Sequence, residues 1–343
     1  MAEGFYVKST IWLPTDITVN GKGIDTEIIT NINSGDDYQT AFELKKVKDV
    51  TIQNLSMTRL GSSNRCIKVG KTSGVKLSNL WFKNAEDPIR ISGATNWTIE
   101  NITASSGNVR VIRVYQGSNA GTINGINISN CSEEAVTIRD DSKWILAWAP
   151  NTYYPVGTVR KPIVYNGNQY VCTLAGTSGE TPPIWPSDEG EDEEDDLIEI
   201  DDGTAKWMFS SSLIYPNDIT VSNFTLNNNL GGFDLRRIQD TEINGGTISN
   251  NRERGISMES CENIKILNAT FTGNGDYAIK FSGCKNILFD YITTTGNRGG
   301  LRFGVQDGVY NTGITIGSHC VLNEEDALKF DGTPSLHEYT DLR

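Results

Sequence analysis

The strongest constraint on the fold is a short apolar–polar–apolar triplet that recurs about once every 23 residues. Triplet centres are 25, 22, 23 and 24 residues apart in the first part of the chain, and 23, 23, 22 and 27 apart in the second. The triplets are Phe42–Leu44, Ile67–Val69, Ile89–Ile91, Ile112–Val114, Val136–Ile138, Phe233–Leu235, Ile256–Met258, Ile279–Phe281, Leu301–Phe303 and Leu328–Phe330. Alternation turns one face of each strand inward, and strands this short bury that face only by stacking in parallel on the next coil. The repeat predicts an all-β, right-handed single-stranded parallel β-helix, a solenoid.

A second repeated pattern supports this prediction. One place in the coil, between apolar residues, is usually occupied by Asn, and in some coils it is occupied by Gly. These two residue types adopt the left-handed backbone conformation that tight bends require. We therefore expect bends at Asn54, Asn79, Asn101, Asn223 and Asn268.

One interval breaks the repeat. The centres Thr137 and Asp234 lie 97 residues apart, and removing the 71 residues 142–212 leaves 26, about one coil. The expected organisation is N-terminal coils in 1–141, a small β-rich domain inserted in one coil at 142–212, and C-terminal coils in 213–343. Asn166-Gly167 is typical of a hairpin turn within the insertion.

The charge of the chain is local. The formal net charge is −13, but 11 of the 15 residues from Asp188 to Asp202 are acidic, so the remainder carries only −2. We interpret this run as a solvated loop and expect no nucleic-acid partner. The sequence has no apolar run long enough to span a membrane, and Met1–Gly4 lacks the basic and apolar regions of a signal peptide. We expect no cofactor and no metal.

The outward triplet residues predict a cationic face. Arg90 and Arg113 lie at triplet centres, and Arg139 and Arg236 lie two residues further along in later coils. Arginines on neighbouring strands could bind the carboxylates of an acidic polysaccharide, or could meet solvent or another protein. Candidate catalytic acids are Asp140, Asp234 and Glu259, although no motif singles out a pair.

The insertion resembles the small carbohydrate-binding, chitin-binding-like modules of glycosidases and phage tail proteins. The resemblance rests on the aromatic-rich start of the insertion, the run Val164–Cys172, the run Gly176–Pro186 and Asp202–Trp207. It implies that exposed aromatic rings stack on sugars, with Trp148, Tyr153, Tyr154 and Trp185 as candidates. The alternative is that a domain this small needs these rings for its core.

The remaining chain resembles the pectate-lyase-like β-helices of phage tailspikes, beginning with the stretch Gly4–Gly23. That resemblance implies a tail spike or surface appendage of the virion, made in the host cytoplasm, that recognises host surface polysaccharide. Other virion proteins and a homotrimer are the implied protein partners, and no membrane is involved. Two alternatives stay open: a polysaccharide depolymerase, either lyase or glycoside hydrolase, that acts in a β-helix groove, and a purely structural decoration protein of the virion.

Overall fold

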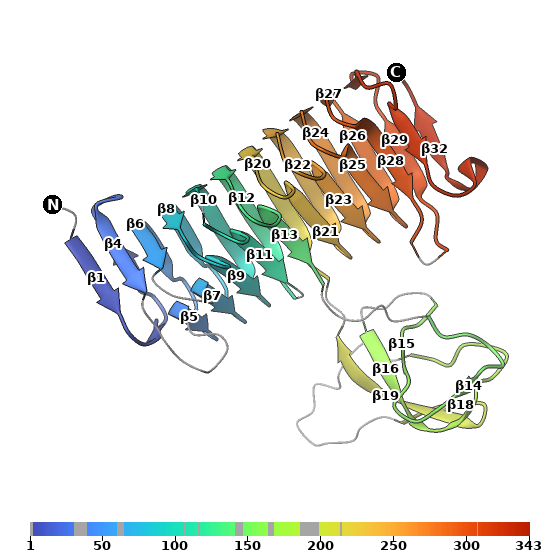
Figure 1. Ribbon diagram of the computed structural model, residues 1–343. Coiled ribbons are helices and arrows are strands. Elements are labelled where there is room, and N and C mark those ends of the chain that lie inside the picture. Colours follow the sequence, from blue (N-terminus) through green and yellow to red (C-terminus); the bar gives the residue numbers. More distant parts are fainter. Residues whose placement is uncertain are drawn as a thin grey trace. The chain divides into compact units, whose positions relative to one another are not determined.

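The chain divides into two compact units (Figure 1). The computed structural model describes residues 3–30, 40–59, 65–105, 107–115, 117–140, 147–163, 168–185, 199–212, 215–306 and 308–343. The first unit joins Met1–Asp140 to Tyr215–Arg343, and the second is Asp141–Ile214. The first unit is a parallel β-helix, in which successive coils stack along one axis.

One face of the β-helix is an 11-stranded parallel sheet, here called the ladder sheet. Its strands are β2 (Ile11–Trp12), β5 (Thr40–Lys45), β7 (Arg65–Gly70), β9 (Ile89–Ser92), β11 (Ile112–Tyr115), β13 (Val136–Arg139), β21 (Phe233–Arg236), β23 (Ile256–Glu259), β25 (Tyr277–Ser282), β28 (Gly299–Gly304) and β31 (Leu328–Phe330). All ten sequence triplets lie in these strands, and consecutive triplets pair in register. The solenoid prediction is confirmed, including direct pairing of β13 with β21 across the long sequence interval.

The other faces form a 15-stranded parallel sheet, here called the long sheet. Its strands are β1 (Glu3–Val7), β3 (Thr18–Asn20), β4 (Thr26–Thr30), β6 (Thr51–Arg59), β8 (Lys76–Lys83), β10 (Thr95–Ser105), β12 (Asn119–Ser129), β20 (Asn217–Asn227), β22 (Gln239–Ser249), β24 (Glu262–Thr272), β26 (Lys285–Asp290), β27 (Thr293–Thr295), β29 (Thr312–Ile316), β30 (Val321–Leu322) and β32 (Tyr339–Asp341). A short 3-10 helix, η1 (Pro334–Leu336), lies near the C-terminus. No helix among the described residues is long and apolar enough to cross a membrane.

The predicted Asn bends lie inside the strands of the long sheet. All five asparagines named above have positive φ, between 51° and 57°. Their side chains also stack from coil to coil: the amide of Asn79 donates to the amide oxygen of Asn54 at 2.9 Å, and Asn101 donates to Asn79 at 3.1 Å. Asn therefore stabilises the bend twice, through its backbone conformation and through a side-chain hydrogen bond along the solenoid.

A second, buried asparagine ladder lines the turn that leads from the long sheet into the ladder sheet. Asn229, Asn251, Asn274 and Asn297 occupy this place in successive coils, and the amide oxygen of each accepts a backbone N–H from the coil before. Around it, Ile, Val, Leu and Phe side chains fill one continuous core. The six cysteines are buried free thiols.

The second unit has its own sheets and core. Strands β14 (Tyr153–Tyr154) and β17 (Gly176–Thr177) form one antiparallel pair, and β15 (Val159–Arg160), β16 (Asn168–Leu174), β19 (Ala205–Ser212) and β18 (Glu199–Asp202) form a four-stranded sheet. Its core contains Trp148, Tyr154, Tyr170, Cys172, Ile200 and Trp207. The predicted hairpin turn at Asn166-Gly167 and most of the acidic run lie outside the described residues.

Candidate functional site: an arginine–carboxylate face on the ladder sheet

The outward residues of the ladder sheet form two columns with the predicted register. The first column runs through Lys68, Arg90, Arg113, Thr137, Asp234, Ser257, Lys280, Arg302 and Lys329. The second runs through Ser92, Tyr115, Arg139, Arg236, Glu259 and Ser282. Parallel pairing thus brings together residues from both sides of the second unit in the sequence, and Arg139 lies directly beside Arg236.

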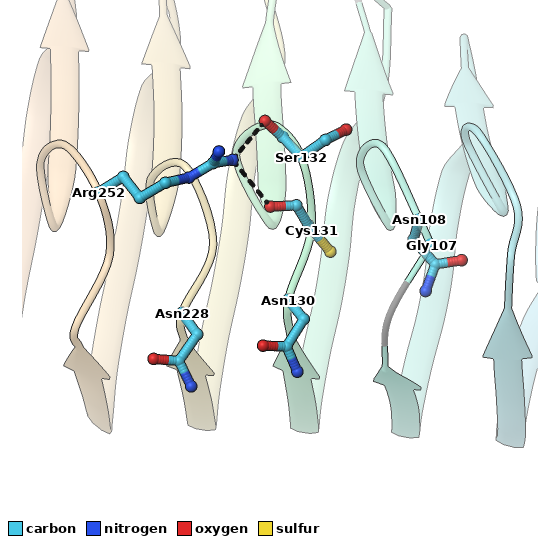
Figure 2. A pocket seen from close by; sticks show the side chains of 7 residues that line it. All are labelled: Gly107, Asn108, Asn130, Cys131, Ser132, Asn228 and Arg252. Atoms are coloured by element: carbon cyan, nitrogen blue, oxygen red, sulfur yellow. Dashed lines mark hydrogen bonds between the residues drawn. The ribbon is translucent and has the colours of Figure 1, made fainter.

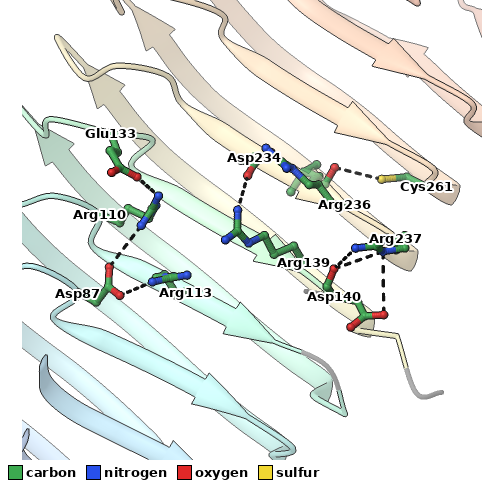
Figure 3. A network of polar contacts seen from close by, with 11 residues as sticks. Asp87, Arg110, Arg113, Glu133, Arg139, Asp140, Asp234, Arg236, Arg237 and Cys261 are labelled. Atoms are coloured by element: carbon green, nitrogen blue, oxygen red, sulfur yellow. Dashed lines mark hydrogen bonds and ion pairs between the residues drawn. The ribbon is translucent and has the colours of Figure 1, made fainter. Parts of the chain in front are cut away.

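Carboxylates of the same chain neutralise much of this predicted cationic face (Figure 3). Arg113 forms an ion pair with Asp87, and Arg110 contacts both Asp87, at 4.0 Å, and Glu133. Burial and then the neighbouring Arg113 lower the pKa of Arg110, while Asp87 opposes that shift. The face is therefore a network of alternating charges rather than a column of unmatched cations.

Asp234 is the centre of a second cluster on this face. One carboxylate oxygen of Asp234 accepts from Nε of Arg236 at 2.9 Å, and the other accepts from Nη1 of Arg139 at 3.4 Å. The Asp234 side chain is only 4% exposed, whereas that of Arg236 is 43% exposed. Partial burial lowers the pKa of Arg236, but Asp234, with a smaller effect of Glu259, outweighs burial and the net shift is upward. Asp234 thus fixes two guanidinium groups side by side, and Arg236 is the more exposed of the two, because the Arg139 side chain is only 18% exposed.

The sequence prediction missed several members of the network, among them Asp87 and Arg110. Each lies three residues before a triplet centre, Asp87 before Arg90 and Arg110 before Arg113. Both belong to turns that precede the strands, so strand alternation does not predict where they point. A charged residue repeated at this offset is the one sequence signal that could have identified them.

Tyr115 also joins this face. Its ring lies beneath two guanidinium groups, with the Cζ atoms of Arg90 and Arg113 at 4.4 and 4.7 Å from its centroid. Cation–π contacts of this kind orient arginine side chains. Arg90 and Arg113 are therefore held in place by contacts within the protein.

The three predicted catalytic acids have different surroundings. Asp140 is 1% exposed and lies beside Arg237, whose Nη2 donates to the Asp140 backbone oxygen at 2.6 Å. Because Asp140 is buried, a polymer cannot reach its carboxylate, and Asp140 is no longer a candidate catalytic acid. Asp234 is engaged by two arginines, as described above. Glu259 is half-buried, pairs in register with Arg236, and is the one of the three that solvent reaches.

The aromatic candidates in the second unit also divide by burial. Trp148 and Tyr154 are 3% and 1% exposed and belong to the core, so neither ring offers a face to a sugar and the prediction for these two residues is wrong. The indole nitrogens of Trp148 and Trp207 donate to the buried Asp202 carboxylate at 2.7 and 2.8 Å. Tyr153 is 64% exposed and stays a carbohydrate-binding candidate.

Trp185 is intermediate between these cases. It is half-buried, and its ring packs against those of Tyr170 and Trp207 at centroid distances of 4.5 and 5.8 Å. Its role in carbohydrate binding stays a prediction.

A pocket of about 520 Å³ lies over the turns of the β-helix, away from the predicted residues (Figure 2). Arg252 reaches across it and donates to the backbone oxygens of Ser132, at 2.9 Å, and Cys131, at 3.4 Å. Cys131 interrupts the buried asparagine ladder here: Asn108 precedes it and Asn229 follows it. Among the described residues, the buried amide nitrogen of Asn108 has no hydrogen-bond partner.

Two family models match parts of the chain. Residues 211–327 match the model described as right handed beta helix region, and residues 11–142 match glycosyl hydrolases family 28. No curated protein matches the chain significantly.

Solved structures share the fold at low sequence identity. A protein of Geobacillus virus E2, ORF18, superposes with a TM-score of 0.56 at 11% identity over 99% of this chain and 53% of that one. A catalytic domain of a GH87 α-1,3-glucanase in complex with tetrasaccharides gives 0.51 at 11% identity over 100% and 63%. An alginate lyase from Paenibacillus sp. str. FPU-7 gives 0.50 at 11% identity over 93% and 89%. This chain thus spans less than two thirds of the viral protein and of the glucanase domain, and the fold it shares with them is the right-handed parallel β-helix.

Proposed function

We propose that this protein is a phage tail-spike or appendage-type β-helix that recognises host surface polysaccharide through the ladder sheet. The main observation behind the proposal is Arg236, whose Nε is held by Asp234 while the side chain stays 43% exposed. Within the described part of the chain, its two terminal nitrogens make no hydrogen bond, so they can donate together to a ligand. Two parallel N–H donors match a sugar carboxylate or a pair of sugar oxygens.

The surroundings of Arg236 favour recognition of a polymer. Glu259 lies beside it in register and adds an acceptor for sugar hydroxyls, and Arg139 lies on its other side. Because parallel strands repeat every ~4.8 Å, an extended chain that crosses the coils would meet one such group after another. The location in a virion is supported by the fold shared with the Geobacillus virus protein; trimerisation and contact with other virion proteins stay predictions.

The test is a binding titration of Arg236→Gln against a panel of bacterial surface polysaccharides. Removing a charge-assisted pair of hydrogen bonds should weaken binding by about 10- to 100-fold. Arg298→Gln is the matched control, because Arg298 is 72% exposed and its contact with Asp276 is 4.0 Å long. Binding that is equal in the wild type and in Arg236→Gln would remove the ladder sheet from recognition. If the wild type binds no glycan at all, the remaining alternative is a purely structural decoration protein of the virion.

A second candidate function is cleavage of the bound polysaccharide. The match of residues 11–142 to glycosyl hydrolases family 28 favours it. Hydrolysis requires two carboxyl groups near the scissile bond, and Glu259 is the accessible acid of the predicted three. The wild type should then release reducing ends from the polysaccharide that it binds, and Glu259→Gln should bind without releasing them. A wild type that binds and never releases oligosaccharides is a binding protein only.

A further inference from the structure

The outer face of the long sheet carries two columns of uncharged polar side chains, here called the hydroxyl face. One column is Thr103, Asn127, Thr225, Thr247, Thr270 and Thr293, and the other is Ser105, Ser129, Asn227, Ser249, Thr272 and Thr295. The residues between the columns, such as Leu226 and Ile248, are fully buried, so the columns point outward. Across these six strands both columns contain only Thr, Ser and Asn, although 21% of the chain is charged.

The hydroxyl groups on this face are available to a ligand. Thr225, Thr247 and Thr270 are exposed, and none of the three makes a side-chain hydrogen bond to another described residue. Each hydroxyl both donates and accepts. The groups repeat every ~4.8 Å along the solenoid, a period close to the length of one sugar residue in an extended glycan.

The first coils of this face are hollowed around a tryptophan. A pocket of about 320 Å³ is lined by Ser56, Thr58, Trp81, Thr103 and Ser105, with Glu27 and Lys83 also at its wall. Trp81 lies in the first column, between Ser56 and Thr103 in the register, and is half-buried. A partly exposed indole beside hydroxyl groups offers both an apolar face and polar neighbours to a ring-shaped ligand.

The composition of the face indicates one ligand class. Nucleic acid requires a row of cations, and these two columns contain none beyond Lys83 at the hollow. A stable protein interface requires an apolar core, and Trp81 is the single large apolar side chain in the first column from Ser56 to Thr293. We propose that the hydroxyl face binds an extended, uncharged polysaccharide that runs across the coils and stacks one sugar on Trp81. This site lies on a different sheet from Arg236 and goes beyond the function proposed above.

The test uses the full chain and a panel of immobilised uncharged polysaccharides (linear glucans, mannans and galactans), with alginate as an acidic probe. We expect at least one uncharged polymer to bind the wild type. Trp81→Ala and Thr225→Lys should each weaken that binding by about 10-fold or more, because one loses the stacking surface and the other places a bulky charge on the face. Thr220→Lys is the matched control, because Thr220 is exposed in the same strand, β20, on the other side of the bend, and should leave binding within about 2-fold.

The outcomes separate this proposal from the previous one. Arg236→Gln should leave binding of the uncharged polymer intact. If the ladder sheet binds no polysaccharide, Thr225→Lys should still weaken binding of the uncharged polymer to the hydroxyl face. The hydroxyl-face proposal is overturned if no uncharged polymer binds, or if binding survives both Trp81→Ala and Thr225→Lys. It is also overturned if Thr225→Lys dissociates an oligomer of the chain in light scattering, since the face would then be an interface between copies.

Discussion

At the scale of single residues, Cys131 shows how one side chain can break a stabilising series. It occupies the place where later coils carry the buried ladder asparagines, and it leaves the Asn108 amide nitrogen without a partner among the described residues. We expect Cys131→Asn to continue the ladder, because its amide oxygen could accept from Asn108 as that of Asn274 accepts from Asn251. The free energy of unfolding should rise by about 1 kcal/mol in urea denaturation. Cys131→Ala is the control, and equal stability of the two variants would contradict the expectation.

The Cys131 thiol also predicts part of the response to alkaline pH. Burial raises its pKa from 9.0 to about 12. Between these values the native thiol keeps its proton while the unfolded thiol loses its own, so this group lowers stability as the pH rises through that window. We expect the wild type to lose stability relative to Cys131→Ala as the pH rises from about 9 towards about 12. A stability difference that stays constant over this range, measured by urea denaturation at each pH, would show that the thiol does not titrate in this way.

Residue-scale features were the least predictable from the sequence. Alternation placed Arg90, Arg113, Arg139 and Arg236 on the outer face correctly. It could not show that Asp87 pairs with Arg113, because Asp87 lies in a turn and its direction depends on tertiary contacts.

At the scale of elements, the buried asparagine ladder holds one coil to the next. Asn251 accepts the backbone N–H of Asn229 at 2.9 Å and donates to Asn274 at 2.9 Å and to the Leu226 backbone at 3.4 Å. Asn251→Ala removes one hydrogen-bond partner from each of three buried groups: the Asn229 N–H, the Asn274 amide oxygen and the Leu226 backbone oxygen.

We expect Asn251→Ala to lower the free energy of unfolding by about 2 kcal/mol or more. Asn127→Ala, on the exposed outer face, should change it by less than about 0.5 kcal/mol. Chemical denaturation of both variants checks this, and a similar small change in the two would mean that the buried ladder contributes little.

The elements themselves were predictable because their causes are local. Period-2 alternation predicted the strands of the ladder sheet, and the left-handed preference of Asn predicted the bends at Asn54 and Asn223. The Thr, Ser and Asn residues of the hydroxyl face can be read from the sequence. They did not predict a binding face, because Thr and Ser are ordinary residues in strands.

At the scale of the whole molecule, the two units have separate hydrophobic cores. The second core is organised around Asp202, which also accepts from the Gly179 backbone at 2.8 Å. Asp202→Ala leaves the indole N–H groups of Trp148 and Trp207 without this buried acceptor. In scanning calorimetry we expect it to lower the transition of residues 141–214 by several degrees and to leave that of the solenoid unchanged. A single transition that shifts as a whole would show that the units unfold together.

The sequence predicted the interruption of the solenoid but not the roles of the aromatic residues within it. The position of the gap follows from counting coils, whereas burial of Trp148 and Tyr154 depends on how a small domain fills its core. Composition alone does not distinguish an aromatic ring that packs in the core from one that stacks on a sugar.

The most direct test of carbohydrate recognition by the ladder sheet is a crystal structure of the full chain with an oligosaccharide from a polysaccharide that it binds. We expect sugar oxygens within hydrogen-bonding distance of the terminal nitrogens of Arg236, beside Glu259. Sugar bound only to residues 141–214, or anywhere else with the ladder sheet unoccupied, would contradict it.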